Sequence, residues 1–436
     1  MRRRSSNGKT LRVPGGAGAL AGVALLLSFA GCALYEPRPV DWREEAARLG
    51  DAPACVTLSV AGVRARAAAF SPELNALRLS RATSEAKVEA SGWWEDPSLE
   101  VDWLRILQSP EHPLVWGGSL AFSLPLSGIP GLERRAAAAY AEADRWALIA
   151  AERAAAGEAA VLAVTARELK AAGAAIGRFI SSSNYLSACA TAARLADAGE
   201  VERVDAEQLA ADAREWTRTA LELAHEQLAA ESALRRTLLL SPACEIGWAR
   251  ETAPVAFPTN AYAPADFTNA PSVKAAVARL AGGEAELDRE IRRQYPELSL
   301  GPAYSREEGF NRMGLTAGLT VPLWNRNRVG IATARGARDE ARSAAVEAWR
   351  DAVRAWHDLK QEATRLHAQD GLPRGTLENA ERLYEAGELD APGYVGAVHR
   401  CLTETVADAR LRIDRESLAE RMKSIVEGMN VKGRDE

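Results

Sequence analysis

Two parts of the chain show apolar and polar residues in alternation. The apolar positions are Leu99, Val101, Trp103, Trp116, Leu120, Phe122 and Leu124 in the first part and Leu315, Ala317, Leu319 and Val321 in the second. A period of two with one apolar and one polar face predicts half-buried β-strands. The polar face also carries Glu100 and Asp102. This pattern fits a soluble β-sandwich, and it also fits a transmembrane barrel with lipid on one side of the sheet and water on the other.

Stretches without internal proline predict helices on either side of these strands. Residues 72–91 and 271–293 form moderate helices, each with a proline near the first turn, where a missing N–H is not needed. Residues 131–241 and 325–369 contain no proline and are rich in alanine, which favours helix. Each half of the chain should hold a helical hairpin with a first arm of about 55–65 residues, or ~80–100 Å at 1.5 Å per residue. Rods of this length predict coiled-coil walls. Gly282-Gly283 is a turn signal.

A glycine late in each long helical region predicts a turn. The two related sequences are Arg194-Leu195-x-x-x-Gly199 and Arg382-Leu383-x-x-x-Gly387. Glycine at this place caps the C-terminus of a helix. Asp205 begins a capping-box pattern that restarts the helix after the first turn, and Asp390 is its equivalent after the second. Pro392, Gly393 and Gly396 then predict an interruption of the second helix.

The same landmarks occur twice along the chain in the same order. They are residues 71–74 and 270–273, 96–101 and 295–300, 120–126 and 317–323, and 194–201 and 382–389. The offset within a pair falls from 199 to 188, which small deletions in the second copy explain. The prediction is an α+β, mostly helical fold in which a unit of helix, β-hairpin and long helical hairpin is duplicated.

The N-terminus has the pattern of a secretion signal. Residues 1–12 carry five basic residues and no acidic one, and residues 13–35 carry no charge. The apolar run ends at Phe29-Ala30-Gly31-Cys32, and small residues directly before a cysteine resemble the lipobox of bacterial lipoproteins. We therefore expect lipidation at Cys32 and sorting to the outer membrane, with a plain cleaved signal or a single anchor helix as the alternatives. Removal of residues 1–31 takes the formal charge from −5 to −10.

Five prolines between residues 242 and 271 separate the two copies and predict an extended connection. Its aromatic residues favour an ordered strap over a flexible linker. They are Trp248, Phe257, Tyr262 and Phe267. The expected organisation is a signal peptide at 1–31, a lipid-anchored segment at 32–70, a first repeat at 71–241, a crossover linker at 242–270 and a second repeat at 271–436.

Composition and charge exclude several classes of protein. Apolar residues make up 47% of the chain, as in globular proteins, and a net charge of −5 argues against a nucleic-acid partner. The five histidines lack metal-ligand spacing, and no nucleotide-binding or hydrolase motif occurs, so we expect no enzyme, no metal and no cofactor. Four cysteines besides Cys32 are expected as small buried residues, with disulfide pairing in the periplasm as the alternative. They are Cys55, Cys189, Cys244 and Cys401.

Together these features resemble the TolC-like family of outer-membrane efflux proteins. The resemblance covers essentially the mature chain. Its most specific stretches are Pro296-Glu-Leu-Ser-Leu-Gly-Pro-Ala-Tyr304 and Gly314-Leu-Thr-Ala-Gly-Leu-Thr-Val-Pro-Leu-Trp-Asn-Arg-Asn-Arg328. With Gly92-Trp-Trp-Glu-Asp-Pro-Ser-Leu-Glu100, they are particularly similar to the branch that serves heavy-metal and cation efflux pumps.

The resemblance implies a homotrimer whose twelve strands form an outer-membrane β-barrel and whose twelve helices continue it as a periplasmic tunnel. The barrel-to-tunnel junctions match Pro125 and Pro322. The tips of the helical hairpins would bind a periplasmic adaptor protein, which links the channel to an inner-membrane pump. The positions that match the tips are Arg194, Leu195, Gly199, Val201, Arg382, Leu383, Gly387 and Leu389. Simple helix capping is the alternative role of these residues.

The expected function is a passive outer-membrane duct in a tripartite efflux system, with the energy supplied by the inner-membrane partner. Glu100 and Asp102, if they face the lumen, would favour cations there. The alternative is a lipid-anchored periplasmic coiled-coil scaffold or adaptor without a pore. The strands and the duplication argue against that alternative, because an adaptor has one helical hairpin.

Overall fold

The computed structural model describes residues 35–50, 55–105, 114–200, 203–249, 257–258, 262–307, 310–367, 377–427 and 429. The chain divides into two units, Met1–Asp51 and Ala52–Glu436. The first unit contains α2 (Trp42–Gly50), and the other elements described belong to the second. Cys32 and the signal sequence lie outside the described residues, as does Val201. No helix in the described part of the chain is long and apolar enough to cross a membrane.

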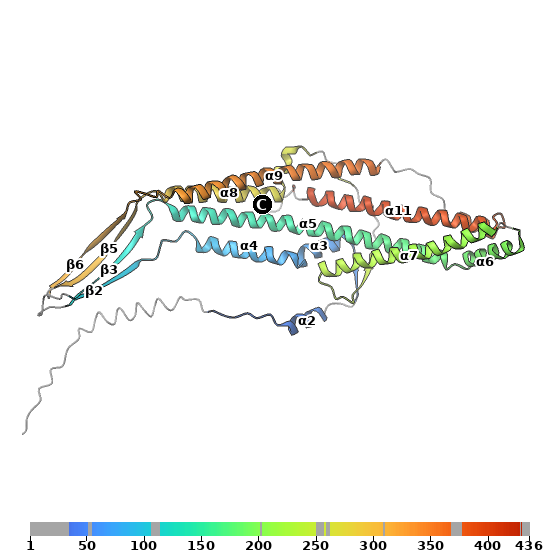
Figure 1. The fold of residues 1–436 in the computed structure, drawn as a ribbon, viewed down its shortest axis with the longest axis horizontal. Helices are drawn as coiled ribbons and strands as arrows, with labels where there is room; N and C mark the ends of the chain where they lie inside the picture. The colour runs from blue at the N-terminus through green and yellow to red at the C-terminus, as the bar shows by residue number, and fades with distance from the viewer. Residues whose placement is uncertain are drawn as a thin grey trace, which may run out of the picture. The chain divides into compact units, whose positions relative to one another are not determined.

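The second unit repeats one order of elements. Its first half consists of β1 (Cys55–Leu58), α3 (Val60–Phe70), α4 (Glu73–Ala90), β2 (Ser98–Arg105), β3 (Leu114–Leu124), α5 (Ile129–Ile180), α6 (Ser183–Ala198) and α7 (Arg203–Thr237). The connection contains β4 (Glu245–Trp248) and the 3-10 helix η1 (Pro264–Asn269). The second half consists of α8 (Pro271–Arg292), β5 (Glu297–Glu307), β6 (Phe310–Thr320), α9 (Arg328–His367), α10 (Leu377–Glu385) and α11 (Ala391–Val426). A helix, two strands, a long helix, a short helix and a long helix thus occur twice in that order (Figure 1).

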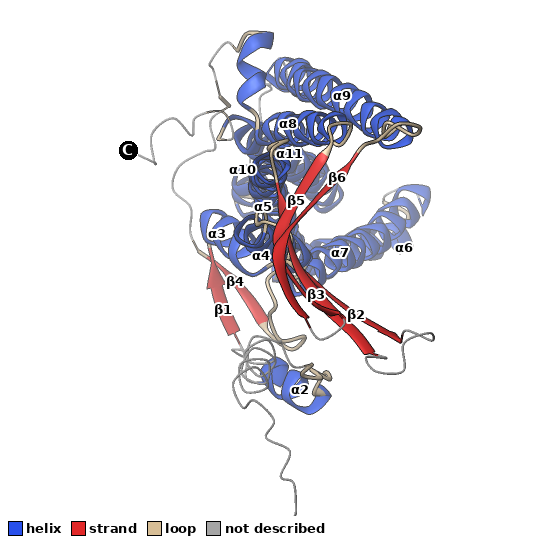
Figure 2. Cartoon of the chain, turned by 90° about the vertical axis from the view of Figure 1, so that its left-hand side faces the viewer, coloured by secondary structure: helices blue, strands red, loops and turns tan. Residues whose placement is uncertain are grey.

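Both halves contribute to one four-stranded antiparallel sheet. Its order is β2-β3-β5-β6, so β3 and β5 pair across the halves while β2 and β6 form the edges (Figure 2). The sheet lies at one end of the helices of the second unit (Figure 1). Between the central strands, a Cβ at Gly301 would overlap the carbonyl oxygen of Leu120. The close approach of β3 and β5 therefore requires the missing side chain of Gly301.

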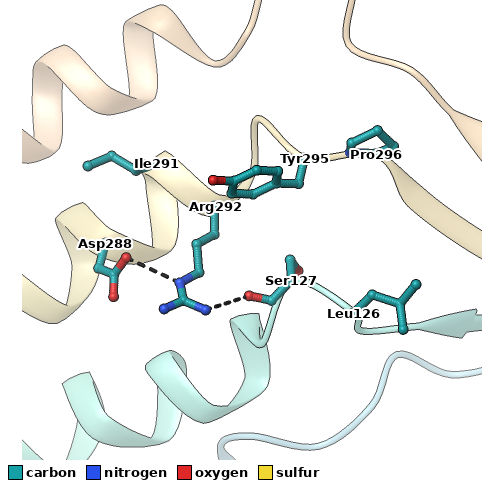
Figure 3. Close-up of a pocket in the computed structure, with 7 residues that line it drawn as sticks. All are labelled: Leu126, Ser127, Asp288, Ile291, Arg292, Tyr295 and Pro296. Atoms are coloured by element: carbon teal, nitrogen blue, oxygen red, sulfur yellow. Dashed lines mark hydrogen bonds and ion pairs between the residues drawn. The ribbon is translucent and has the colours of Figure 1, made fainter.

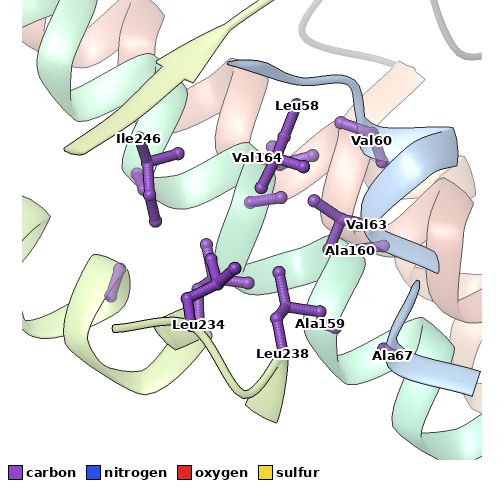
Figure 4. Close-up of a cluster of buried hydrophobic side chains, with 14 of the residues drawn as sticks. Leu58, Val60, Val63, Ala67, Ala159, Ala160, Val164, Leu234, Leu238 and Ile246 are labelled. Atoms are coloured by element: carbon purple, nitrogen blue, oxygen red, sulfur yellow. The ribbon is translucent and has the colours of Figure 1, made fainter. Parts of the chain in front are cut away.

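A small parallel sheet and three helices enclose the core beside the middle of α5. β1 pairs with β4, and Cys55 lies opposite Glu245. Beneath them Val63 of α3, Ala163 of α5 and Leu234 of α7 are completely buried in one cluster, part of which Figure 4 shows. The sequence did not predict β1 or β4, because four residues are too few to display a period.

The expected first arm consists of two helices in the first half of the chain. α5 ends after 52 residues and α6 is a separate helix of 16 residues. Ser181 and Ser182 stand at the break. The Ser182 hydroxyl accepts the backbone N–H of Tyr185 at 3.3 Å and so caps α6. Serine ends and starts helices readily because its hydroxyl replaces a missing backbone partner.

The start of α11 also differs from the prediction. α11 continues without interruption through Pro392, Gly393 and Gly396. Asp390 caps it, because its Oδ1 accepts the Gly393 N–H at 3.0 Å, and Pro392 lies in the first turn, where no N–H is required. The predicted cap at Asp390 is confirmed. α7 begins before Asp205, which therefore lies inside the helix and does not precede it.

Gly282 and Gly283 lie within α8, although a turn was expected there. A Cβ at Gly282 would overlap the ring of Tyr140 on α5, and one at Gly283 would lie 3.4 Å from the backbone of Arg338 on α9. Glycine at these two positions lets α8 pack closely between α5 and α9. The pair therefore serves helix packing, and local sequence alone does not distinguish that role from a turn.

Buried ion pairs join the first and last helices of the second unit. Arg64 of α3 is 8% exposed and pairs with Glu420 of α11, which is 3% exposed, at an N···O distance of 2.7 Å. A second nitrogen of Arg64 contacts Glu427. Removing one member of such a pair would leave an unpaired buried charge. The contact therefore fixes α11 against the first half of the chain.

Aromatic side chains hold the end of the connection against α9. Phe267 is buried, and its ring centroid lies 6.3 Å from that of Trp356. Tyr262 meets Trp356 edge to face at 5.1 Å. The Trp349 Nε1–H donates to the carbonyl oxygen of Pro264 at 3.0 Å. Over residues 262–270 the connection is thus an ordered segment packed on a helix.

Candidate functional site: a two-faced sheet and two helical tips

The four-stranded sheet has one apolar and one polar face. Paired residues in an antiparallel sheet point to the same side, so the register assigns each residue to a face. The apolar face includes Leu99, Val101, Trp103, Trp116, Leu120, Phe122, Leu124, Leu298, Leu300, Tyr304, Met313, Leu315 and Leu319, and the register places Arg105, Arg306 and Asn311 on the same face at the end away from the helices. The opposite face includes Glu100, Asp102, Ser119, Ser123, Ser299, Ser305, Arg312, Thr316 and Thr320. The period-two pattern thus continues in register across all four strands.

The edge strands are open on both faces. Every residue of β2 is exposed, and on β6 the side chains of Met313 and Leu315 are 85% and 87% exposed. The prediction of half-buried strands is therefore wrong for these two strands in the single chain, because the sheet stands clear of the helices (Figure 1). An apolar surface of this extent indicates contact with lipid or with another protein.

The passage from β3 to α5 is held by the end of α8. Pro125 follows the strand, and Gly128 has a left-handed backbone, with φ of 71°, just before the helix. Arg292 donates from Nη1 to the carbonyl oxygen of Ser127 at 3.0 Å, and its Nε contacts Asp288 at 3.2 Å (Figure 3). These contacts fix the direction in which α5 leaves the sheet.

The passage from β6 to α9 uses a different turn. Pro322 follows the strand, and Arg326 and Asn327 then have φ values of 45° and 48°, which non-glycine residues rarely adopt. The Asn327 amide donates to the backbone oxygen of Glu290 at 2.9 Å and to its Oε2 at 2.7 Å. Burial opposes ionisation of Glu290, but hydrogen bonds from Asn327 and Arg289 hold its pKa below the usual value. These contacts stabilise the unusual backbone.

The two predicted glycine turns have the same geometry. Gly199 ends α6 with φ of 77°, and Gly387 follows α10 with φ of 71°. The bonds that close the turns run from the N–H of Glu200 to the carbonyl of Leu195 at 2.9 Å and from the N–H of Glu388 to the carbonyl of Leu383 at 2.9 Å. This is the Schellman arrangement, in which glycine avoids the clash of a Cβ in a left-handed residue.

The second tip lies beside the start of α6, the end of that helix opposite to Gly199. The Asn184 side chain on α6 donates to Glu385 on α10 at 3.1 Å. Arg194 and Arg382 are exposed, whereas Leu195, Leu383 and Leu389 are half-buried. The tips therefore present arginine and glycine to solvent while their leucines pack inward.

A buried polar cluster behind the tips was not predicted. Tyr185 of α6 and His399 of α11 are both buried, and the Tyr185 hydroxyl lies 2.8 Å from His399 Nε2. His399 Nδ1 lies 3.4 Å from Asp212 Oδ2 of α7 and has no hydrogen-bond partner among the described residues. Burial lowers the pKa of His399, and the Asp212 charge opposes this shift. The consecutive helices α6 and α7 meet the distant helix α11 here, so no local pattern could have revealed the cluster.

The described residues offer little for metal or redox chemistry. No group of three or more His, Cys, Asp or Glu side chains among them could hold a metal ion. The four described cysteines are free thiols. Cys244 is buried, Cys189 and Cys401 are half-buried, and Cys55 is exposed, so burial is confirmed in full only for Cys244.

The fold is similar to that of solved membrane proteins. No family model and no curated protein matches the sequence. A membrane protein from Pseudomonas aeruginosa is 17% identical with a TM-score of 0.65, covering 91% of this chain and 97% of its own. The CmeC outer membrane channel of Campylobacter jejuni is 13% identical with a TM-score of 0.65, covering 93% and 92%. CusC, described in terms of folding and transmembrane channel formation, is 15% identical with a TM-score of 0.63, covering 91% and 95%.

At these identities the likeness establishes the fold. The chain has the mostly helical architecture with a small sheet that these membrane proteins share, and its resemblance to the TolC-like family is confirmed at the level of the fold.

Proposed function

We propose that this protein is the outer-membrane channel of a tripartite efflux system and conducts substrate passively from the periplasm to the exterior. The observation that carries the proposal is the exposed sheet with one apolar and one polar face at the end of long helices. In a closed barrel the apolar face would contact lipid and the polar face would line a water-filled pore. The fold shared with solved channels supports this assignment.

The channel is a homotrimer in this proposal. Four strands are too few to close a barrel, whereas three copies would supply twelve. β2 and β6 leave their backbone groups free at the two edges, and β6 of one copy can continue the antiparallel sheet with β2 of the next. The helices would continue the barrel as a tunnel, with Pro125 and Pro322 at the junctions. The repeated order of elements supports an internal duplication.

The proposed location is the outer membrane, with the helices extending into the periplasm. Cleavage after residue 31 and lipidation of Cys32 would add a lipid anchor to the barrel. This part rests on the sequence pattern before Cys32. Mass spectrometry of the mature chain would show a lipidated N-terminal cysteine, and an unmodified N-terminus would contradict it.

The two tips are the proposed docking surface for a periplasmic adaptor, which would link the channel to an inner-membrane pump. The residues assigned to this role are Arg194, Leu195, Gly199, Val201, Arg382, Leu383, Gly387 and Leu389. Each glycine turn forms a blunt helix end near an exposed arginine, which suits contact with the tip of another helical hairpin. Docking would open the periplasmic end of the tunnel.

Cations, metal cations among them, are the proposed substrate class. Glu100 and Asp102 lie on the polar face of β2, and three copies would place six carboxylates in the pore. The resemblance to the heavy-metal branch supports the same class. In this proposal the protein provides a water-filled pore and acts on the cations through its charges, not through catalysis.

The test is conductance of the purified full chain in planar lipid bilayers, together with its mass in detergent. We expect a trimer that conducts ions with cation preference. The double variant Glu100→Gln/Asp102→Asn should conduct equally and lose that preference. A folded trimer without conductance would contradict the channel and favour a lipid-anchored periplasmic scaffold.

A further inference from the structure

Three arginines without ion-pair partners gather where β6 passes into α9. Arg326, Arg328 and Arg335 are exposed and line one groove with Gln294, which lies between α8 and β5. Among the described residues none of the three forms an ion pair, whereas the next arginine of α9, Arg338, pairs with Glu284 at 3.1 Å. The end of β6 therefore carries a basic surface, the basic corner, with unused charge.

Carboxylates without partners gather where α4 passes into β2. Glu89, Glu95 and Asp96 are exposed, and none forms an ion pair with another described residue. They precede the other edge strand of the same sheet. We call this second surface the acidic corner. Its charge is opposite to that of the basic corner, and it lies at the opposite edge strand of the sheet.

The strand register places both corners at the same end of the sheet. Ser98 at the start of β2 pairs with Ala121 near the end of β3, and Thr320 at the end of β6 pairs with Glu297 at the start of β5. β3 and β5 pair with each other next to these residues. The two corners thus lie at the same end of the sheet, the end next to the helices, and on its opposite edges.

We propose that the basic corner of one copy binds the acidic corner of the next copy, so that Arg326 and Arg328 pair with Glu95 and Asp96 where β6 meets β2. This inference rests on the proposed edge-to-edge assembly of copies. It adds the charged contact that would favour pairing of β6 with β2 of the next copy. The partner is a second copy of this chain, because the charges are complementary and the contact continues the open strand edges. A head-to-tail contact of this kind closes into a ring when the rotation permits.

Charge pairing would also fix the direction of assembly. If two copies with the same membrane orientation met through their β6 edges, the two strands would run parallel and bring two basic corners together, and like charges across an interface are strongly disfavoured. Trp324 at the basic corner and Trp93 at the acidic corner are both exposed, so the same contact would cover aromatic surface. The corners therefore favour β6 against β2 over the two self-pairings.

The experiment is a charge swap in the full mature chain, purified in detergent and analysed for trimer by native mass spectrometry and sedimentation. Arg326→Glu/Arg328→Glu and Glu95→Lys/Asp96→Lys should each lower the apparent trimer association constant about tenfold or more. The combination of all four substitutions should restore it. Arg178→Glu, a charge reversal on an exposed part of α5 far from the sheet, is the matched control and should leave the trimer intact.

The outcomes separate this inference from the channel proposal. A wild-type chain that never trimerises would overturn both. A stable trimer that neither charge reversal weakens would overturn the corner contact and leave the channel standing. Loss of trimer with the basic reversal but no rescue by the swap, together with loss of binding to phosphatidylglycerol vesicles, would make a lipid phosphate the ligand and overturn the proposal.

If the charge-reversal variants do not fold, neutral substitutions provide a second test. The neutral variants Arg326→Gln/Arg328→Gln and Glu95→Gln/Asp96→Asn should trimerise less than wild type at low salt and equally at about 1 M salt, where surface charges are screened. An unchanged salt dependence of the trimer in these variants would contradict the ion pairs between copies.

Discussion

α5 and α9 follow the same pattern of strand, proline and long helix, yet their surroundings differ. α5 buries side chains along most of its length and contacts α3, α4, α7, α8 and α11. Of the described side chains of α9, only Trp356 and Ala363 are buried, and this helix contacts α8, α11 and η1. The reason lies in the sheet, because α5 continues the central strand β3 while α9 continues the edge strand β6.

The difference shows that a repeated local sequence pattern determines where a long helix forms, but not which other helices pack against it. The turn before each helix agrees with this. The α5 turn uses Gly128 and is held by Arg292, whereas the α9 turn uses the non-glycine residues Arg326 and Asn327. An outer helix with one side open is what a protomer needs if another copy is to cover that side.

The largest expected effect contrasts a buried with an exposed ion pair. Arg64→Ala removes the nearest charge partner of the buried Glu420, which keeps only Lys423 at 3.9 Å, and should destabilise the protein by about 3–5 kcal/mol. On α9, Arg354 pairs with Asp351 at 3.8 Å with both side chains exposed, and Arg354→Ala should change stability by less than about 1 kcal/mol. Thermal unfolding followed by circular dichroism measures both. Equal effects would show that α11 is not held by the buried pair.

The second effect compares packing along the two helices. Ala163 of α5 is completely buried, so Ala163→Leu should overpack the core and destabilise it by about 1–3 kcal/mol. Ala337 of α9 is exposed, and Ala337→Leu should leave protomer unfolding unchanged. Denaturant midpoints of the two variants give the comparison. A similar loss at residue 337 would mean that α9 is as enclosed as α5.

The third effect tests whether the two tips are equivalent. Gly199→Ala and Gly387→Ala place a Cβ on a left-handed residue, and each should destabilise its turn by about 1 kcal/mol. Gly396→Ala inside α11 would place its Cβ 3.9 Å from the Arg400 guanidinium, an ordinary contact, and should stabilise by ~0.5 kcal/mol. Hydrogen exchange at α6 and α10 reports the local change. Opposite behaviour of the two tips would contradict their shared geometry.

The smallest effect concerns the cluster that joins α6 of the first half to α11 of the second. Burial lowers the pKa of His399 below 6.5, against the charge of Asp212. The unfolded chain therefore binds more protons between the folded pKa and 6.5, so this contribution to stability is present above pH 6.5 and is lost as the pH falls. Wild type should lose stability below about pH 6.5. His399→Gln, which can still accept a hydrogen bond from Tyr185, should make the free energy of unfolding depend less on pH in this range. An unchanged pH dependence would mean that other groups cause the loss of stability.

Local signals allowed the strands and tips to be predicted. The alternation from Leu99 to Trp103 identified β2, and Gly199 and Gly387 identified the turns, because period and cap depend on neighbours in sequence. The pairing of Arg64 with Glu420 joins residues 356 apart, and Tyr185 meets His399 across 214 residues. Such contacts depend on how whole helices dock, so they have no signature in the residues around each partner. The open faces of β2 and β6 likewise follow from their place at the edges.

The glycine at the centre of the sheet has a consequence for sequence divergence. Because Gly301 admits the Leu120 carbonyl, a two-residue slip would place Ser299 or Ala303 there, and either side chain would collide with it. A one-residue slip would exchange the two faces. Because the missing side chain of Gly301 fixes the register of β5 against β3, many other residues on either face can be substituted as long as their polarity is kept. A fold pinned in this way can persist among chains that share few amino acids.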